Sequence, residues 1–453
     1  MKITVFGCGY VGLTTAVGLA EMGNEVLGID VAPDKIELLE QGIVPFYEPG
    51  LQEMLLRQIT EGRLRFSTDA AEGIQTSQII FSAVGTPPLK DHYADLSAVL
   101  NVAEQFKKYA KGQKIFINKS TVPIGTSDKI LEIIRSNRRN SHDFHVVSNP
   151  EFLREGTALK DFFEPDRIVI GVYDHSPEIQ KLMKKLYRPM LEKGVPLLFT
   201  DIRSAEVIKY ASNAYLATRL SFINELANFC ETAGADIQNV RLGVGMDKRI
   251  GTHFFQPGIG FGGSCLPKDL NALIEMGKQQ GFPFRVMEAA QHVNLRQPKR
   301  LVQALERIFP TYKGKTIAVW GASFKPGTDD LRDAPSLVIL QTLLEGGAKI
   351  QIYDPVSLQK LQKIFGKKIT YCQDYYRALH QASALLILTE WDEFRNPDFG
   401  RMKSSMKEHY ILDGRNIFDR EEVEKQGFYY YGIGNLSPQR KLKSRRSQVR
   451  LGL

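Results

Sequence analysis

Residues 2–30, KITVFGCGYVGLTTAVGLAEMGNEVLGID, carry the pattern that decides the fold of this 453-residue chain. Residues 2–6 read as a short apolar strand, and Gly7, Gly9 and Gly12 follow it in the GxGxxG spacing. Gly7 permits a tight turn, Gly9 lets backbone approach a pyrophosphate, and Gly12 lets the next helix pack on the strand. The stretch therefore predicts a βαβ unit that holds a dinucleotide.

The residues after this turn indicate which dinucleotide is bound. A helix is expected from Leu13 to Met22, with its N-terminal N–H groups and partial positive charge directed at the phosphates. A second strand, Glu25 to Ile29, ends in Asp30, where an acid can accept hydrogen bonds from the adenosine ribose. The Asp30 charge would repel a 2′-phosphate, so NAD is predicted over NADP. A secretory signal is the rival interpretation, but signal peptides lack this glycine spacing.

Composition excludes several classes of protein. The length suits about three domains, and 43% hydrophobic with 24% charged residues is ordinary for a soluble globular protein. No apolar run approaches the roughly 20 residues that span a bilayer. Four cysteines without metal-ligand spacing and eight histidines without an HxxxH pair predict no metal site and a cytoplasmic location.

The net charge of +8 is concentrated at the C-terminus. Six basic residues and no acid lie between Arg440 and Leu453, so the rest of the chain is nearly neutral. We therefore predict no nucleic-acid partner and interpret residues 437–453 as a disordered, solubilising tail. A contact with acidic polymers or a membrane surface is the alternative for this tail.

Short apolar segments alternate with amphipathic stretches through the first 200 residues, as in a doubly wound parallel sheet. Residues 84–88, 119–123 and 149–156 follow expected strands, and ligands bind at such carboxyl ends. The expected strands are Ile79 to Val84, Lys114 to Asn118, His145 to Ser148 and Ile168 to Val172.

A long helix is predicted from Ser204 to about Thr232, because this stretch contains neither Gly nor Pro. Lys209 and Asn213 are four residues apart on it and share one face, where they could meet one substrate atom. The alternative is that Lys209 is an ordinary solvated lysine.

A second nucleotide-binding lobe is predicted to begin at the strand Thr316 to Trp320. Its turn, residues 321–327, lacks the GxGxxG spacing, although Asp354 again ends the next strand. We therefore predict an α/β fold with two Rossmann-like doubly wound lobes joined by a long central helix. The predicted domains are 1–200 for NAD, 201–298 for a central helical dimerisation domain, 313–436 for the nucleotide sugar, and 437–453 for the tail.

A glycine-rich loop presents the candidate nucleophile. Residues 258–263, GIGFGG, precede Ser264 and Cys265, and Pro267 suits the first turn of a following helix. A thiol there lies near the positive end of a helix and near Lys268, and both favour the thiolate.

These motifs together resemble the nucleotide-sugar 6-dehydrogenases of the UDP-glucose/GDP-mannose dehydrogenase family, from Gly7 to about Asn416. They recur in fixed order as residues 7–12, 47–51, 119–126, 149–156, 209–214, 258–269, 324–325 and Arg332. The resemblance implies oxidation of UDP-glucose to UDP-glucuronate with two NAD in succession, through a thiohemiacetal and a thioester on Cys265. Leu266 departs from the UDP-glucose branch, where Phe is frequent, toward the GDP-mannose branch, whereas Lys248 to Gly251 resemble the former.

The resemblance also implies the site residues. Lys209 and Asp269 would handle protons, Asn213 would stabilise an oxyanion, and Glu151 with Thr121 would activate water. The implied NAD contacts are Gly7, Gly9, Tyr10, Val11, Gly12, Asp30, Lys35, Thr86, Thr121, Glu155, Lys268 and Arg332. The implied substrate contacts are Glu151, Phe152, Leu153, Arg154, Glu155, Lys209, Asn213, Arg249, Gly258, Phe261, Gly262, Phe324, Lys325 and Arg415. Arg249 would reach the neighbouring subunit's site, which implies a homodimer.

Two rival functions are weighed against this one. A one-step hydroxyacid dehydrogenase shares the first lobe and a helical spine but needs neither Cys265 nor the second lobe. A protein that senses NAD or a UDP-sugar without turnover would have an unreactive, buried thiol. The NADH yield per substrate separates these readings.

Overall fold

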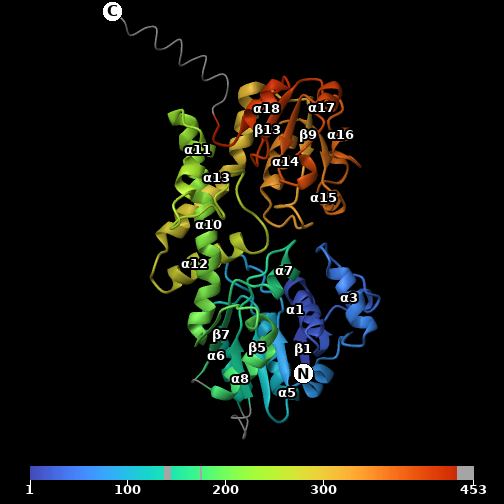
Figure 1. The fold of residues 1–453 in the computed structure, drawn as a ribbon, viewed down its shortest axis with the longest axis vertical. Helices are drawn as coiled ribbons and strands as arrows, with labels where there is room; N and C mark the ends of the chain where they lie inside the picture. The colour runs from blue at the N-terminus through green and yellow to red at the C-terminus, as the bar shows by residue number, and fades with distance from the viewer. Residues whose placement is uncertain (137–143, 174–175, 436–453) are drawn as a thin grey trace, which may run out of the picture. The chain divides into compact units, whose positions relative to one another are not determined.

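The computed structural model describes residues 1–136, 144–173 and 176–435, which fall into two compact units (Figure 1). Unit 1 comprises Met1–Ser212 and Asn271–Phe282, and unit 2 comprises Asn213–Leu270 and the chain from Pro283 onward. The expected tail, 437–453, lies outside the described residues. The boundaries predicted for the three domains stay a prediction.

Unit 1 contains an eight-stranded sheet in the order β3-β2-β1-β4-β5-β6-β7-β8. The strand order reverses beside β1, so the GxGxxG turn lies at the switch point where dinucleotides bind in such sheets. Apolar side chains cover both faces of the sheet. The strands are β1 Lys2–Phe6, β2 Glu25–Ile29, β3 Leu64–Ser67, β4 Ile79–Ser82, β5 Lys114–Asn118, β6 Phe144–Ser148, β7 Ile168–Val172 and β8 Leu197–Asp201.

One strand corrects the prediction of a wholly parallel sheet. β7 has the predicted bounds but runs antiparallel to β6, while β8 is parallel to β7. The connection from β6 to β7 holds only the short helix α7, Ala158–Phe163. This helix packs on α1, Tyr10–Glu21, where a Cβ added to Gly18 would lie 2.2 Å from the Phe162 ring. The segment therefore does not make the crossover that a parallel strand requires.

The helices of unit 1 follow the predicted alternation with strands. α1 begins at Tyr10, three residues before the predicted start, because Gly9 already occupies its N-cap. The others are α2 Pro33–Glu40, α3 Leu51–Thr60, α4 Ala70–Thr76, α5 Ser97–Tyr109, α6 Thr126–Arg135, α8 Pro177–Leu186 and α9 Arg188–Leu191.

Unit 2 contains a six-stranded parallel sheet in the order β11-β10-β9-β12-β13-β14, which confirms the predicted second Rossmann-like lobe. Apolar clusters lie on both of its faces. The strands are β9 Thr316–Trp320, β10 Lys349–Tyr353, β11 Thr370–Tyr371, β12 Ala384–Ile387, β13 Tyr410–Asp413 and β14 Tyr429–Gly432. The helices around it are α14 Pro335–Glu345, α15 Leu358–Phe365, α16 Tyr375–Ala378, α17 Phe399–Ser405 and α18 Arg420–Lys425, with 3-10 turns at Gly366–Lys368 and Asp392–Phe394.

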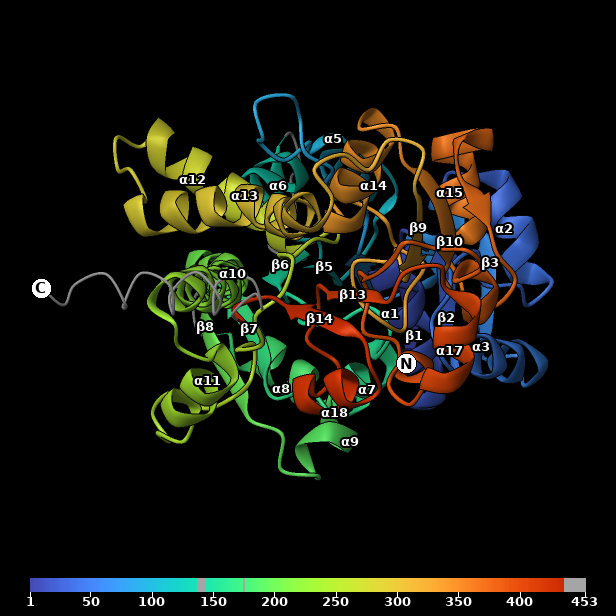
Figure 2. The ribbon, with the colours of Figure 1, turned by 90° about the horizontal axis from the view of Figure 1, so that it is seen from above.

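The predicted long helix is α10, Ile202–Ala233, and it contributes residues to both units. In unit 2, α13, Arg285–Ile308, lies beside it (Figure 2). The Ser221 hydroxyl donates to the Ala290 carbonyl at 2.6 Å, and Asn228 donates to Gln297 at 2.9 Å. The remaining helices are α11 Ile237–Gly245 and α12 Leu266–Gln279.

Candidate active site

The turn after β1 has the geometry that its glycines predict. Gly7 has a φ of +88°, and a Cβ on Gly12 would lie 1.6 Å from the Gly7 carbonyl oxygen. A Cβ on Gly9 would meet nothing within 4 Å, so the turn is open at that residue. No side chain caps the N-terminus of α1. These features fit a dinucleotide pyrophosphate, which backbone N–H groups of a helix start can bind.

Asp30 lies at the end of β2 and is 8% exposed. Its carboxylate accepts from the Cys8 N–H at 2.8 Å, the Ala32 N–H at 3.1 Å and the Lys35 ammonium at 2.7 Å. Burial acts to raise the Asp30 pKa, but the hydrogen bonds from Lys35 and the backbone prevail and lower it. Asp30 is therefore an ionised acid beside the turn, as the ribose contact requires.

A buried ion pair lies in unit 1 at the carboxyl ends of the strands. The Lys209 ammonium donates to the Glu151 carboxylate at 2.9 Å, and both side chains are 5% exposed. The Leu153 N–H donates to the second Glu151 oxygen at 2.6 Å. Burial acts to raise the Glu151 pKa, but the charge and hydrogen bond of Lys209 hold it below its usual value. The alternative of a solvated Lys209 is wrong, because β6 and α10 bring this pair together out of water.

The remaining predicted residues of the 149–156 segment differ in environment. The Arg167 guanidinium lies 3.5 Å from the centroid of the Phe152 ring, and the Lys209 ammonium lies 5.4 Å from it. Arg154 is exposed and paired with Asp161 at 2.5 Å. Leu153 and Glu155 are half-buried in the same segment.

A polar contact joins the loops after β4 and β5. The Thr86 hydroxyl donates to the Thr121 carbonyl at 2.7 Å. Thr86, Thr121 and Glu151 thus all follow strands whose carboxyl ends share one edge of the sheet.

In unit 2, Cys265 immediately precedes α12 and its carbonyl accepts the Asp269 N–H at 2.8 Å. The thiol is half-buried, 3.4 Å from the Ser264 hydroxyl. By contrast, burial raises the pKa of Cys8 to about 12, and burial together with a nearby aspartate also raises those of Cys230 and Cys372. Cys265 is the one cysteine of the four that is not buried.

The glycines before Cys265 allow this loop to pack closely against neighbouring segments. A Cβ on Gly262 would lie 2.3 Å from the Asp333 carbonyl oxygen, and one on Gly263 would lie 2.7 Å from the Phe324 ring. Gly263 also donates its N–H to the Arg332 carbonyl at 2.8 Å. These glycines hold the loop against the second lobe, a role that the sequence did not reveal.

Asp269 lies one turn into α12 and is 1% exposed. Its carboxylate accepts from the Asn213 amide at 2.6 Å and from the Lys268 ammonium at 2.5 Å. This cluster places an acid, an amide and a cation in unit 2 at the helix that begins beside Cys265.

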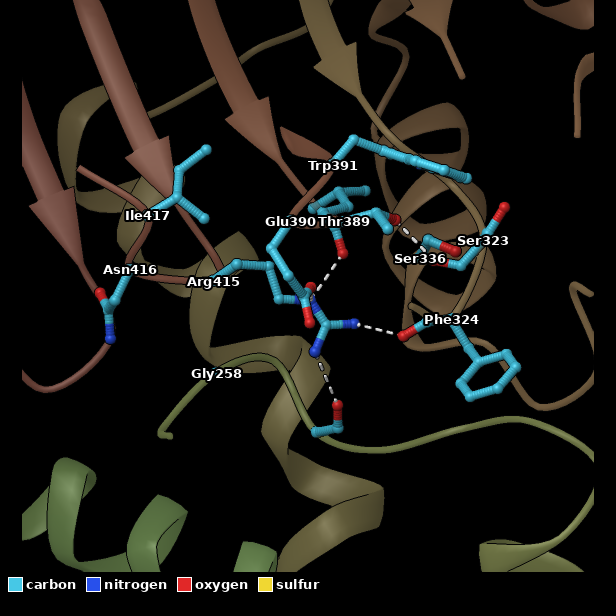
Figure 3. A network of polar contacts seen from close by, with 12 residues as sticks. Gly258, Ser323, Phe324, Ser336, Thr389, Glu390, Trp391, Arg415, Asn416 and Ile417 are labelled. Atoms are coloured by element: carbon cyan, nitrogen blue, oxygen red, sulfur yellow. Dashed lines mark hydrogen bonds and ion pairs between the residues drawn. The ribbon is translucent and has the colours of Figure 1, made fainter. Parts of the chain in front are cut away.

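A cavity of 590 Å³ lies within unit 2, a size typical of sites for small ligands. The Arg415 guanidinium bridges its walls and donates to the Phe324 carbonyl at 3.0 Å (Figure 3). It also donates to the carbonyls of Leu388 at 2.8 Å and Gly260 at 3.3 Å. Six predicted residues line this cavity: Gly258, Phe261, Gly262, Phe324, Lys325 and Arg415.

Three comparisons with known proteins bear on this geometry. Models of the UDP-glucose/GDP-mannose dehydrogenase family match residues 1–191 as its NAD binding domain, 203–296 as its central domain and 318–420 as its UDP binding domain. The chain belongs to this family. NAD is therefore the cofactor, and the enzyme is an oxidoreductase.

Several relatives are similar along nearly their whole length. A UDP-glucose 6-dehydrogenase of Pseudomonas aeruginosa is 44% identical over 445 residues, covering 96% of this chain and 97% of its own. UDP-glucose 6-dehydrogenase TuaD of Bacillus subtilis is 42% identical, with 96% and 93% covered. The structure of a UDP-glucose dehydrogenase from Pyrobaculum islandicum is similar with a TM-score of 0.87, 37% identity, and 96% and 98% covered.

This family member has cavity residues that the sequence reasoning missed. Arg241 and Gln238 of α11 line the cavity, as do Arg395 and Glu390, which follow β12. Glu390 pairs with Arg415 at 3.2 Å. Gln238 and Arg241 are three residues apart and therefore lie on one face of α11. This spacing was the feature of the sequence that could have indicated them as cavity residues.

Two predicted arginines lie on exposed segments of unit 2. Arg249 pairs with Asp247 at 2.6 Å, and its side chain is 89% exposed. Arg332 pairs with Asp330 at 2.6 Å. Neither lines the cavity.

The described ranges contain neither a cluster of metal ligands nor a membrane-spanning helix. No group of three or more His, Cys, Asp or Glu side chains there is arranged to hold a metal ion. No helix of those residues combines the length and apolarity that a bilayer crossing requires.

Proposed function

We propose that this chain catalyses the NAD-dependent, four-electron oxidation of UDP-glucose to UDP-glucuronate. The observation that carries the proposal is that the glycine loop leading to Cys265 forms a wall of the 590 Å³ cavity, together with Lys325 and Arg415. A diphosphate that meets these cations would leave its sugar near the loop that bears the thiol. The relatives named UDP-glucose 6-dehydrogenase support this choice of sugar over the GDP-mannose alternative.

Cys265 is the proposed nucleophile. NAD, when bound, supplies a hydride acceptor and is used twice in succession. A first hydride transfer to NAD, with loss of the hydroxyl proton, would convert the C6 alcohol to an aldehyde. The Cys265 thiolate would add to this aldehyde, and hydride transfer from the resulting thiohemiacetal to a second NAD would leave a thioester. Water then attacks the thioester carbon, the carbon–sulfur bond breaks, and the thiolate and the carboxylate are released.

Buried polar groups carry the proton transfers in this proposal. Lys209 and Asp269 exchange protons with the C6 oxygen, and the Asn213 amide stabilises the developing oxyanion. Glu151 takes a proton from the hydrolytic water, which Thr121 holds. The ionised state of Glu151, maintained by Lys209, supports its role as a base.

The NAD site is assigned to the first lobe and its neighbours. The glycine turn and the first turn of α1, with Tyr10 and Val11, would hold the pyrophosphate, and Asp30 with Lys35 the ribose. Thr86, Thr121, Glu155, Lys268 and Arg332 complete the proposed set.

The stoichiometry of NADH tests the function directly. We expect two NADH and one UDP-glucuronate per UDP-glucose, with little free aldehyde, because the thiohemiacetal keeps the aldehyde bound between the two hydride steps. NADH absorbance and product chromatography on the purified protein measure this. One NADH with aldehyde release would instead identify a one-step dehydrogenase, and no NADH at all a sensor. Turnover of GDP-mannose in place of UDP-glucose would move the protein to the sister branch.

Asp30 is expected to set the preference for NAD. Asp30→Ser should lower the ratio of kcat/KM for NAD to that for NADP about tenfold, or 1.4 kcal/mol. The effect is modest because Lys35 already neutralises part of the repulsion toward a 2′-phosphate. Glu25→Gln, which removes a charge at the other end of β2, is the control. An unchanged ratio in Asp30→Ser would contradict the assignment.

The proposal includes a homodimer in which Arg249 reaches the neighbouring subunit's site. Tyr215, Phe222 and Phe229 recur every seven residues on α10 and are 60%, 51% and 64% exposed. An aromatic stripe of this kind suits burial against a second copy. The exposed Arg249 side chain is in keeping with a role outside its own subunit.

The proposal also places the protein in the cytoplasm. Its four cysteines are all free thiols, as a reducing compartment maintains.

A further inference from the structure

A second lysine accompanies the Glu151–Lys209 pair in unit 1. Lys119 follows β5 directly and is 6% exposed. Its ammonium donates to the Asn149 side-chain carbonyl at 3.3 Å. That carbonyl also accepts from the Tyr187 hydroxyl, and the Asn149 amide donates to the Val169 carbonyl at 3.0 Å. Lys119 is therefore held in one place by a residue that is two positions before Glu151.

The charges around Lys119 come from two other parts of unit 1. Glu151, after β6, attracts its ammonium, and Lys209, on α10, repels it. The Lys119 charge in turn acts on the Glu151 carboxylate, favouring its ionised form. The charges of two buried lysines thus act on one buried carboxylate, which leaves an excess of one positive charge when all three are ionised.

We propose that Lys119 is a positioning residue for Glu151: its protonated ammonium holds the Asn149 side chain and thereby keeps the segment that carries this carboxylate in place for the hydrolysis of the Cys265 thioester. The inference rests on the proposed function. Water gives its oxygen to the thioester carbon and a proton to Glu151, and the sulfur leaves as thiolate. Lys119 itself exchanges no proton with the substrate in this step.

The environment of Lys119 gives the proposal a pH signature. Burial lowers the pKa of Lys119 to about 8, despite the attraction of Glu151. The charge that strengthens the hydrogen bond from Lys119 to Asn149 is therefore present below about pH 8 and lost above it. Tyr187 does not titrate in this range, because burial raises its pKa further above the usual value. We expect thioester hydrolysis to decline as the pH rises through about 8.

Three variants test this role. Lys119→Met removes the charge and is expected to slow thioester hydrolysis about tenfold at pH 7, with accumulation of the adduct on Cys265. Lys119→Arg keeps the charge at every pH and should move the alkaline decline upward by at least one pH unit. Lys114→Met is the matched control: Lys114 is a buried lysine at the other end of β5, bound to the carbonyls of Gln75 and Ser77. It should leave the decline where it is in the wild type.

The experiment is a single turnover with UDP-glucose and excess NAD between pH 6.5 and 9.5. Acid quenching and intact mass spectrometry follow the adduct, and thermal unfolding verifies the fold of each variant. The role would be overturned if Lys119→Met hydrolysed the thioester at the wild-type rate. It would also be overturned if the alkaline decline of Lys119→Arg occurred at the same pH as in the wild type. The absence of any decline near pH 8 in the wild type would do so even if no variant folds. A wild type that forms no thioester and no uronate would refute the proposed function itself, so the two failures are distinguishable.

Discussion

Cys265→Ala is expected to abolish uronate formation, with turnover reduced at least a thousandfold. Without the sulfur no thiohemiacetal or thioester forms, and a thousandfold loss corresponds to about 4 kcal/mol in the activation free energy. Steady-state NADH production from UDP-glucose measures the effect, and product chromatography verifies that no uronate appears.

Cys372→Ala is the matched control for loss of a thiol. Cys372 belongs to unit 2, as Cys265 does, but burial raises the pKa of its thiol and keeps it unreactive. This variant should retain wild-type turnover. If Cys265→Ala kept a tenth of the wild-type rate, the covalent mechanism would be wrong.

Lys209→Met should produce the largest loss of stability, about 3–5 kcal/mol at pH 7, because it leaves the Glu151 carboxylate buried without its closest cation. Chemical denaturation followed by circular dichroism measures the difference in unfolding free energy. Lys185→Met, on the exposed side of α8, should change it by less than about 0.5 kcal/mol.

The loss should depend on pH in a defined direction. In the wild type the Glu151 pKa is lowered, because Lys209 overcomes the effect of burial. The Glu151 carboxylate therefore stabilises the fold fully when the pH is above its pKa in the unfolded chain, about 4.3. This stabilisation disappears as the pH falls through the lower pKa of Glu151 in the folded protein. In Lys209→Met the lysine no longer offsets the effect of burial, so the pKa of Glu151 in the folded protein is expected to rise. The ionised Glu151 carboxylate then destabilises the fold at neutral pH. The gap between the two proteins should narrow below about pH 4.

A double variant separates the pair from the packing around it. Lys209→Met combined with Glu151→Gln removes both charges and should recover much of the lost stability. A double variant no more stable than Lys209→Met would show that the lysine acts through packing and not through its charge.

The two Rossmann-like lobes and the long helix could be predicted from the pattern of residues alone, whereas most candidate site residues came from the family resemblance. These features rest on local physics: the spacing of Gly7, Gly9 and Gly12, the absence of helix breakers in α10, and apolar runs of strand length. The start of α1 and the direction of β7 were missed. Both depend on neighbours, since Gly9 supplies an early N-cap and α7 packs back on α1.

The electrostatics and the close packing could not be predicted from the sequence. Glu151 and Lys209 are 58 residues apart, and their pairing arises because the end of β6 faces α10. The cavity gains Arg241 and Arg395 from segments that no motif connects to the Cys265 loop. Gly262 and Gly263 are needed because another segment lies against them. Burial and charge pairing depend on many residues that are distant in the chain. A pattern of neighbouring residues therefore predicts the fold but not the pKa values of the groups within it.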